Sequence, residues 1–261
     1  EKAKAMLAEP GYDLVVLDEL TYMLTYGYLD KEMVLQALEN RPEMQHVVVT
    51  GRSEARLADA AASHERITGM VCDVTRDDQV IALREHMDAE GGTDILVNNA
   101  GVMHAFDVTS GFPLDKQLQE IDIDVAGPVR MVHHFLQGLL GRESMIVNVS
   151  SSLAYAPYAA APVYSASKAF LHSYTQGLRA QLADTSVRVV ELLPPVVDTP
   201  LADGLDPSFA RMSPETLAAT FLRDLRRGRD ESTPGLARGL KWGSRIAPGL
   251  LFRQLNKSPR G

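Results

Sequence analysis

The sequence predicts an α/β fold in which helices cover both faces of a parallel sheet. Short apolar runs rich in Val, Ile and Leu recur along the chain, and helical patterns separate them. Parallel strands that are buried on both faces are continuously apolar, whereas half-exposed strands alternate between apolar and polar residues. We therefore predict a doubly wound parallel sheet in three layers, α/β/α.

The individual elements follow from apolar runs, helix caps and turn residues. Strands are expected at Asp13–Leu17, His46–Thr50, Ile67–Cys72, Ile95–Val97, Met145–Val149 and Val187–Leu193. Helices are expected at 1–9, 31–39, 53–63, 77–89, 114–140, 164–183 and 214–226. Gly127-Pro128 is expected to kink the long helix, because proline lacks a backbone donor. This regular alternation predicts one domain over residues 1–261.

Composition excludes several classes of function. The net charge of −8 argues against a general nucleic-acid surface. The single cysteine, Cys72, cannot form an internal disulfide and offers no metal cluster. His133 and His134 have no partner at ligand spacing, so we expect no metal site. No apolar run reaches the roughly 18 residues that span a membrane, and no signal-peptide pattern is present. We expect a cytoplasmic protein.

Tyr164 and Lys168 form the first candidate for chemistry. They are four residues apart in a helical pattern, so they share one helix face. An ammonium beside a phenol lowers the phenol's pKa from about 10, because the positive charge favours phenolate. Such a tyrosine can exchange a proton with a substrate oxygen, and Ser151 could hydrogen-bond that oxygen. The spacing alone also suits a pair on a helix surface.

Polar or unusual residues follow the predicted strands. In an open parallel sheet, ligands bind beyond the carboxyl ends of the strands. These ends carry Arg52, Asp73, the turn 98–101, Ser150-Ser151 and Pro194-Pro195. We expect them to line one edge of the sheet.

Four motifs occur in a fixed order at this edge. They are N-N-A-G at 98–101, Ser151 thirteen residues before Tyr164, Y-S-A-S-K at 164–168 and P-P-V-V-D-T at 194–199. With them, the chain from about residue 47 to its end resembles the short-chain dehydrogenases/reductases, which have a Rossmann-like fold. The segment R-I-A-P-G-L-L-F at 245–252 is similar to the tail of one subgroup of that family.

The resemblance implies an NAD(P)-dependent oxidoreductase that moves a hydride between nicotinamide and a carbonyl or alcohol. Tyr164 would exchange the proton, Lys168 would lower the tyrosine's pKa and bind the nicotinamide ribose, and Ser151 would hold the substrate oxygen. The other residues implied in cofactor binding are Asp73 and Val74 at the adenine, Asn98, Ala100 and Gly101 along the adenosine, and Pro195, Val197 and Thr199 at the nicotinamide.

Arg52 bears on the choice of cofactor. It follows the second strand of the family's sheet, where it could pair with a 2′-phosphate and so favour NADP over NAD. Its alternative role is that of a solvated turn arginine.

Asp124 departs from the family pattern. An asparagine is usual at this position, about 25 residues after N-N-A-G, where it supports a water-linked proton relay to the lysine. An aspartate accepts hydrogen bonds but cannot donate them as an amide does. We expect Asp124 to attract the Lys168 charge if the two are close.

The N-terminal segment departs further. The family's T-G-x-x-x-G-x-G loop is absent, and the strand before it is followed by D-E-L-T-Y-M-L-T-Y-G-Y. Residues 1–52 instead resemble the C-terminal part of ATP:corrinoid adenosyltransferases, in which Asp18 and Glu19 match an acidic strand end near the nucleotide. That family's phosphate-binding loop is also absent. The strand predicted at 46–50 suits both families, so a borrowed β-α-β unit could complete the sheet.

This junction leaves three functional hypotheses. The first is the oxidoreductase, the second is a catalytically silent chimera with impaired cofactor binding, and the third is an adenosyltransferase relic. The chimera could be designed or could arise by recombination or misassembly. Relatives commonly pair through two long helices, here 114–140 and 162–183, so we expect a homo-oligomer. The basic, apolar tail 238–260 suits either a membrane surface or an amphipathic helix packed on the protein.

Overall fold

The computed structural model describes residues 14–18, 46–62, 67–203, 205–206 and 208–257. In this part of the chain, seven parallel strands form one sheet in the order β3-β2-β1-β4-β5-β6-β7. The strands are β1 (Leu14–Asp18), β2 (His46–Gly51), β3 (Ile67–Val71), β4 (Ile95–Asn98), β5 (Ser144–Val149), β6 (Val187–Leu192) and β7 (Glu231–Ser232). This sheet confirms the predicted doubly wound α/β fold.

Strand β1 lies in the middle of the sheet. It pairs in parallel with β2 on one side and with β4 on the other. In the backbone register, Val15 is the partner of Val47 in β2 and of Ile95 in β4. The predicted pairing of the first two strands is therefore present. The helices predicted at 1–9 and 31–39, and the segment 19–30 that replaces the glycine-rich loop, lie outside the described residues.

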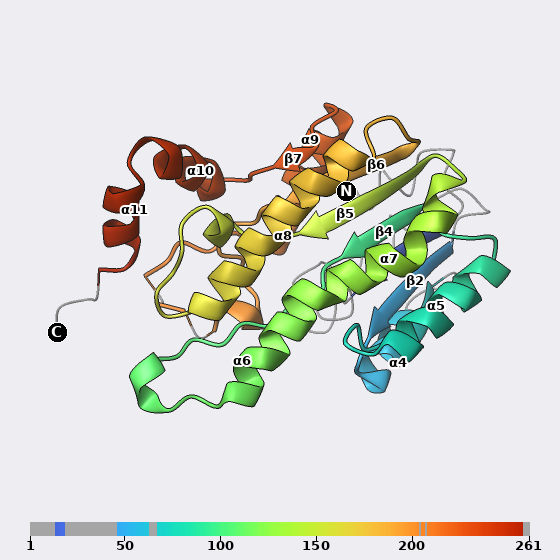
Figure 1. Ribbon diagram of the computed structural model, residues 1–261, viewed down its shortest axis with the longest axis horizontal. Coiled ribbons are helices and arrows are strands. Elements are labelled where there is room, and N and C mark those ends of the chain that lie inside the picture. Colours follow the sequence, from blue (N-terminus) through green and yellow to red (C-terminus); the bar gives the residue numbers. More distant parts are fainter. Residues whose placement is uncertain (1–13, 19–45, 63–66, 204, 207, 258–261) are drawn as a thin grey trace.

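Helices connect the strands and cover the sheet. They are α4 (Glu54–Ala62), α5 (Asp77–Ala89), α6 (Leu114–Ile121), α7 (Gly127–Leu140), α8 (Pro162–Gln181), α9 (Pro214–Arg226), α10 (Leu236–Ile246) and α11 (Pro248–Leu255). Figure 1 shows α5, α7 and α8 side by side across the near face of the sheet. Four buried side chains of these helices, Leu83 and Met87 of α5 and Phe135 and Leu139 of α7, belong to the same core cluster as Ile146 of β5.

The long helix expected at 114–140 is interrupted earlier than predicted. A π-helical turn, Asp122–Ala126, joins α6 to α7, and Gly127-Pro128 follows it directly as the first two residues of α7. Proline has no N–H to donate to the preceding turn, and the wider π turn lies directly before Gly127-Pro128. A Cβ on Gly127 would lie 2.8 Å from Val74 Cγ2, so this glycine allows α7 to approach the loop after β3. The π turn also carries the buried Asp124.

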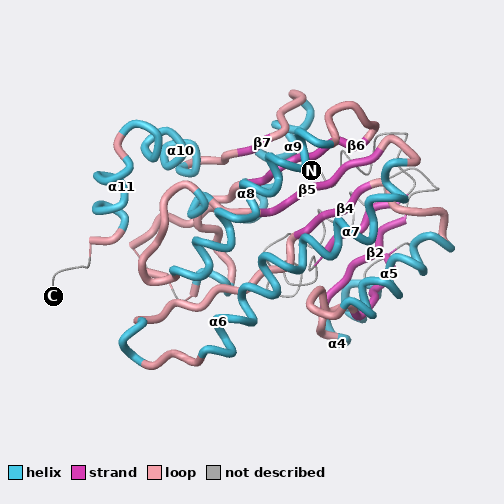
Figure 2. The backbone as a smooth tube through the Cα atoms, in the orientation of Figure 1, coloured by secondary structure: helices cyan, strands magenta, loops and turns pink. Residues whose placement is uncertain are grey.

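The C-terminal tail forms two short amphipathic helices. Figures 1 and 2 show α10 and α11 at one end of the molecule, on the side to which β5 runs. Trp242 and Ile246 of α10 and Leu250 and Phe252 of α11 remain exposed. Among the described helices, none is long and apolar enough to cross a membrane.

Candidate active site

The strand-end residues gather around one cavity. Figure 2 shows loops beyond the carboxyl ends of β4 and β5, where the chain leaves the sheet. A cavity of about 460 Å³ opens among these loops. Its wall includes the predicted residues Arg52, Gly101, Ser151, Tyr164, Lys168, Pro195, Val197 and Thr199. Residues separated by more than 140 positions in the sequence thus contribute to one cavity wall.

Tyr164 and Lys168 lie one turn apart on α8 and both are buried. The helix begins at Pro162, so Tyr164 sits in its first turn, beside the loop that follows β5. Lys168 Nζ is 5.4 Å from the centre of the Tyr164 ring. Ser151 hydrogen-bonds with the Tyr164 hydroxyl, and its Oγ also accepts a hydrogen bond from Leu153 N. The predicted serine, tyrosine and lysine are therefore brought together.

The pKa of Tyr164 reflects burial as well as the neighbouring charges. The Lys168 charge lowers the pKa of the phenol, as expected, but the pKa of Tyr164 as a whole is raised. Burial is the largest cause, because it disfavours phenolate, and the Lys168 charge offsets only part of it. The negative charges of Asp124 and Glu120 raise the pKa further.

Lys168 is held by groups on two different elements. Its Nζ lies 3.2 Å from Asp124 Oδ2 and donates a hydrogen bond to the Val149 carbonyl at 3.3 Å. The expected attraction between Asp124 and Lys168 is thus present as a fully buried ion pair. The other carboxylate oxygen of Asp124 accepts a hydrogen bond from Val102 N at 2.9 Å.

Gly101, the last residue of the N-N-A-G motif, makes this ion pair fit. A Cβ at this position would lie 3.2 Å from both Asp124 Oδ2 and Lys168 Nζ, closer than most real Cβ contacts. Its missing side chain therefore leaves room for the two charged groups against the backbone.

Two further polar residues at this site escaped the sequence analysis. Glu120 is fully buried near the end of α6, and its Oε2 is 3.0 Å from His104 Nδ1 and accepts a hydrogen bond from His104 N. His104 lines the cavity. The available signal was the four-residue spacing of Glu120 and Asp124, which places both carboxyls on one helix face. Burial raises the pKa of each carboxyl, and the Asp124 charge raises that of Glu120 further.

The residues assigned to adenosine meet at a second, smaller pocket. Arg52, Asp73, Val74, Ala100 and Gly101 are among the residues that line it. Arg52 is exposed and also lines the larger cavity. The Asp73 carboxylate accepts hydrogen bonds from Thr75 N and Thr75 Oγ1 and so holds the turn that follows β3.

Asn98 lies elsewhere than the other assigned residues. Its side chain is buried in the sheet, where its Nδ2 donates to Asn148 Oδ1 at 2.8 Å. Asn148 in turn donates to Thr175 Oγ1 at 2.8 Å, so the chain of hydrogen bonds links β4 and β5 to α8. Asn98 thus supports the strand end from within, and its neighbour Asn99 lines the cavity.

The segment after β6 closes the far side of the cavity. Val197 pairs with Met212 in an isolated β-bridge, which fixes the stretch that carries Pro195 and Thr199. The cavity there is largely apolar: Leu201, Leu205 and Leu217 join its wall, and the sequence analysis did not identify them. In the described part of the chain, no group of three or more His, Cys, Asp or Glu residues could hold a metal.

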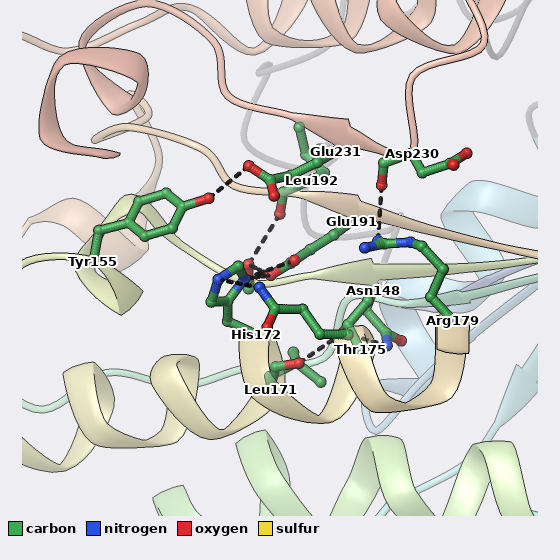
Figure 3. A network of polar contacts seen from close by, with 12 residues as sticks. Asn148, Tyr155, Leu171, His172, Thr175, Arg179, Glu191, Leu192, Asp230 and Glu231 are labelled. Carbon is green, nitrogen blue, oxygen red and sulfur yellow. Dashed lines mark hydrogen bonds and ion pairs between the residues drawn. The ribbon is translucent and has the colours of Figure 1, made fainter. Parts of the chain in front are cut away.

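A polar network lies behind the cavity. Figure 3 shows His172 of α8 pointing toward Glu191 of β6. Glu191 is fully buried, its Oε2 is 2.8 Å from His172 Nδ1, and its Oε1 accepts a hydrogen bond from Ser150 Oγ at 2.6 Å. Tyr155 donates to Glu231 Oε1 at 2.7 Å, and Lys241 of α10 pairs with the same carboxylate. This network ties the serine segment after β5 to α8, β6 and α10.

Comparisons with known proteins agree with this arrangement. A family model described as short chain dehydrogenase matches residues 37–208. The oxidoreductase DltE of Bacillus subtilis (strain 168) is 39% identical over 217 residues, which cover 80% of this chain and 86% of that protein. A short chain dehydrogenase from Burkholderia cenocepacia J2315, solved in complex with NADP, has a TM-score of 0.80 and 24% identity over 95% of this chain and 99% of its own. One from Burkholderia phymatum, solved with NAD, has a TM-score of 0.73 and 19% identity over 88% and 92%. The family match, the sequence relative and the shared fold together show that the chain belongs to the short-chain dehydrogenase family.

Proposed function

We propose that this chain is an NAD(P)-dependent oxidoreductase that transfers a hydride between nicotinamide and a small carbonyl or alcohol substrate. The observation that carries the proposal is the convergence of Ser151, Tyr164 and Lys168 on the wall of one cavity. A phenol with a buried ammonium beside it and a hydroxyl bonded to it is suited to exchanging a proton with a substrate oxygen. The apolar leucines of the cavity favour a substrate with an apolar body.

The described residues fit the cofactor at both of its ends. Lys168 and Tyr164 would hold the nicotinamide ribose, and Pro195, Val197 and Thr199 would lie against the nicotinamide ring. At the other end, Asp73, Val74 and Ala100 line a pocket of about 10 Å³, and the adenosine would lie against these residues. The bound nicotinamide supplies or accepts the hydride.

Tyr164 performs the acid–base step. In the reducing direction it donates its phenolic proton to the substrate oxygen as the hydride adds to the carbonyl carbon, so the product is an alcohol. Ser151 hydrogen-bonds the same oxygen and holds it toward the phenol. Lys168 stabilises the phenolate that remains and can return a proton to it. In the oxidising direction the same groups act in reverse.

Arg52 supports NADP as the preferred cofactor. Its exposed side chain lines both the cavity and the small pocket, and we propose that a 2′-phosphate would lie beside it. A charge-assisted hydrogen bond contributes about 1.5–3 kcal/mol, which corresponds to about 10- to 150-fold in affinity. NAD has no 2′-phosphate and would not gain this contact.

We also propose a homo-oligomer that forms through α6 and α8. Leu114, Leu118 and Ile121 of α6 and Phe170 of α8 are exposed apolar side chains. An interface between two copies would remove this apolar surface from water. Gel filtration with light scattering tests the assembly directly.

The segment 1–52 is proposed to be an adenosyltransferase-like β-α-β unit joined to the dehydrogenase. The parallel pairing of β1 with β2 and β4 supports a segment that completes the sheet, and the dehydrogenase match begins only at residue 37. The sequence after β1 carries only Gly27 in place of the family's glycine-rich loop. Loss of two or three charge-assisted contacts to phosphate would remove roughly 3–9 kcal/mol of binding. A catalytically silent fold is therefore the second candidate.

Cofactor titration distinguishes the two candidates. NADPH and NADH are titrated into the protein while the nicotinamide fluorescence is followed. Micromolar binding of NADPH that weakens about 10- to 150-fold in Arg52→Ala, with NADH binding unchanged, supports the enzyme and its NADP preference. No binding at millimolar cofactor identifies the silent fold. A Tyr164→Phe variant that keeps full turnover would remove the acid–base assignment.

A further inference from the structure

We propose that Asp124 and Glu120 share one proton at neutral pH and, with His104, form a side-chain path that carries protons between Lys168 and the cavity. The proposal rests on the proposed function for its catalytic meaning. Its structural basis is a chain of groups that leads from the acid–base pair to a partly exposed histidine.

The inner part of the path is a buried ion pair. Lys168 Nζ is 3.2 Å from Asp124 Oδ2, and both side chains are at most 4% exposed. Lys168 is thus in direct contact with a group that can accept or return a proton. An amide at this position could hold Lys168 but could not take up its proton.

The middle of the path is a pair of carboxyl groups. Glu120 precedes Asp124 by four residues, and both side chains are completely buried. Glu120 Oε1 has no hydrogen-bond partner among the described residues. A buried carboxylate oxygen without a partner is costly, whereas a carboxyl group that carries a proton can donate it to a neighbouring carboxylate.

The outer end of the path is His104. Its Nδ1 is 3.0 Å from Glu120 Oε2, and its side chain is 28% exposed. It lines the same cavity as Tyr164. An imidazole can accept a proton at one ring nitrogen and donate one from the other, so His104 can pass protons between Glu120 and water.

A proton in this cluster would balance the charges around Tyr164. The ionisable groups that act on Glu120 are His104 and Asp124, and those that act on Asp124 are Lys168 and His104. Both carboxyls and Tyr164 act on Lys168. If both carboxyls were ionised, they would outweigh the single Lys168 charge and oppose phenolate formation. One proton shared by the carboxyls leaves the cluster neutral when Lys168 is charged.

The proton balance of a reduction is complete with these groups. Tyr164 gives its proton to the substrate oxygen, and Lys168 returns one to the phenolate. The proton shared by Glu120 and Asp124 then moves to Lys168. His104 in its protonated form gives a proton to Glu120, and water returns a proton to His104. Each turnover takes up one proton from solvent.

Infrared spectroscopy tests the shared proton without any cofactor or substrate. The free protein is titrated with acid and base while the carbonyl stretch of protonated carboxylic acids is followed. We expect such a band at neutral pH, and we expect Glu120→Gln and Asp124→Asn each to abolish it. If the wild-type protein has no such band at neutral pH, or if Glu120→Gln leaves it unchanged, the shared proton is disproved.

Kinetics test the path itself, with NADPH and benzaldehyde as the probe carbonyl. Tyr164 holds its proton before the first turnover, so His104→Asn should leave single-turnover reduction unchanged. Steady-state turnover should fall about tenfold or more, and added imidazole should restore it. The control His134→Asn changes a histidine that pairs with the exposed Asp77 on the protein surface, and it should behave as wild type.

The outcomes separate this proposal from the proposed function. A Tyr164→Phe variant without activity, combined with unchanged steady-state turnover in His104→Asn, retains the oxidoreductase and disproves the path. If the wild-type protein does not oxidise NADPH with benzaldehyde, the infrared titration alone decides whether Glu120 and Asp124 share a proton.

Discussion

Asp124 on the π-helical turn and Lys168 on α8 form an ion pair whose atoms lie 3.2 Å apart and whose side chains are almost completely removed from water. The Asp124 charge raises the pKa of the Lys168 ammonium above its ordinary value, although burial acts against the charged form. The lysine that supports Tyr164 therefore depends on a residue from another element for its charge.

Asp124→Ala is expected to destabilise the protein strongly. Removal of one partner of a buried ion pair leaves the other charge uncompensated, which costs about 3–5 kcal/mol. Urea denaturation measures this loss in the free energy of unfolding. Asp124→Asn should lose less stability, because it keeps an acceptor for Lys168. Addition of Lys168→Met to Asp124→Ala should recover much of the stability. Effects that simply add in the double variant would contradict a direct interaction between the two residues.

Glu120→Gln is expected to change how stability depends on pH. The pKa of Glu120 is raised in the folded protein, first because of burial, so the fold favours its protonated form. Its stabilising contribution is therefore complete below the ordinary carboxyl pKa of 4.5 and is lost as pH rises through the higher folded value.

The free energy of unfolding, measured in urea across this pH range, should fall less steeply with rising pH in Glu120→Gln than in the wild type. The variant should thus gain stability relative to the wild type between acid and neutral pH. Parallel curves for the two proteins would show that the pKa of Glu120 is the same in the folded and unfolded states.

The sheet and the proximity of Tyr164 to Lys168 could be predicted from the sequence because both have local signals. The strands are continuous apolar runs, and the Tyr164–Lys168 spacing places two side chains on one face of any helix. The π turn at 122–126 has no such signal, because a single wide turn leaves the apolar pattern on either side intact. Strand β7 has only two residues and no period to detect.

The pairing of Glu120 with His104 could not be predicted for a different reason. These residues are 16 positions apart, and only the packing of α6 beside the loop after β4 brings them into contact. The direction of the Tyr164 pKa shift depends on the same packing. Spacing predicted the ammonium beside the phenol, but the depth of burial and the second carboxyl are properties of the folded chain.

Gly101→Ala is expected to impair activity while the protein stays folded. The added Cβ would stand 3.2 Å from both charged atoms of the Asp124–Lys168 pair, so these side chains must shift. Lys168 would then be displaced from the position in which it supports Tyr164, and we expect turnover to fall about tenfold or more.

The control for this change is Gly177→Ala. This position lies in α8, where a Cβ would have no atom within 4 Å. Alanine there should stabilise the helix by about 0.5–1 kcal/mol and leave turnover unchanged. Circular dichroism checks that both variants fold, and equal turnover in the two would contradict the role assigned to Gly101.

His172→Ala is expected to lower the free energy of unfolding. Glu191 is fully buried, and its carboxylate is held by His172 Nδ1 and Ser150 Oγ. Figure 3 shows the histidine as the group that reaches Glu191 from α8. Without the imidazole, a buried carboxylate keeps only the Ser150 hydrogen bond, and the loss should approach the 3–5 kcal/mol typical of a broken buried pair.

The matched control for this variant is His134→Ala. His134 contacts Asp77 at a similar distance, 2.7 Å, but the Asp77 side chain is 63% exposed. Removal of an exposed pair typically costs no more than about 1 kcal/mol, because water replaces the lost partner. Urea denaturation should therefore separate the two variants by at least about 2 kcal/mol. Equal losses would show that Glu191 is satisfied without His172, and that Ser150 alone holds this carboxylate.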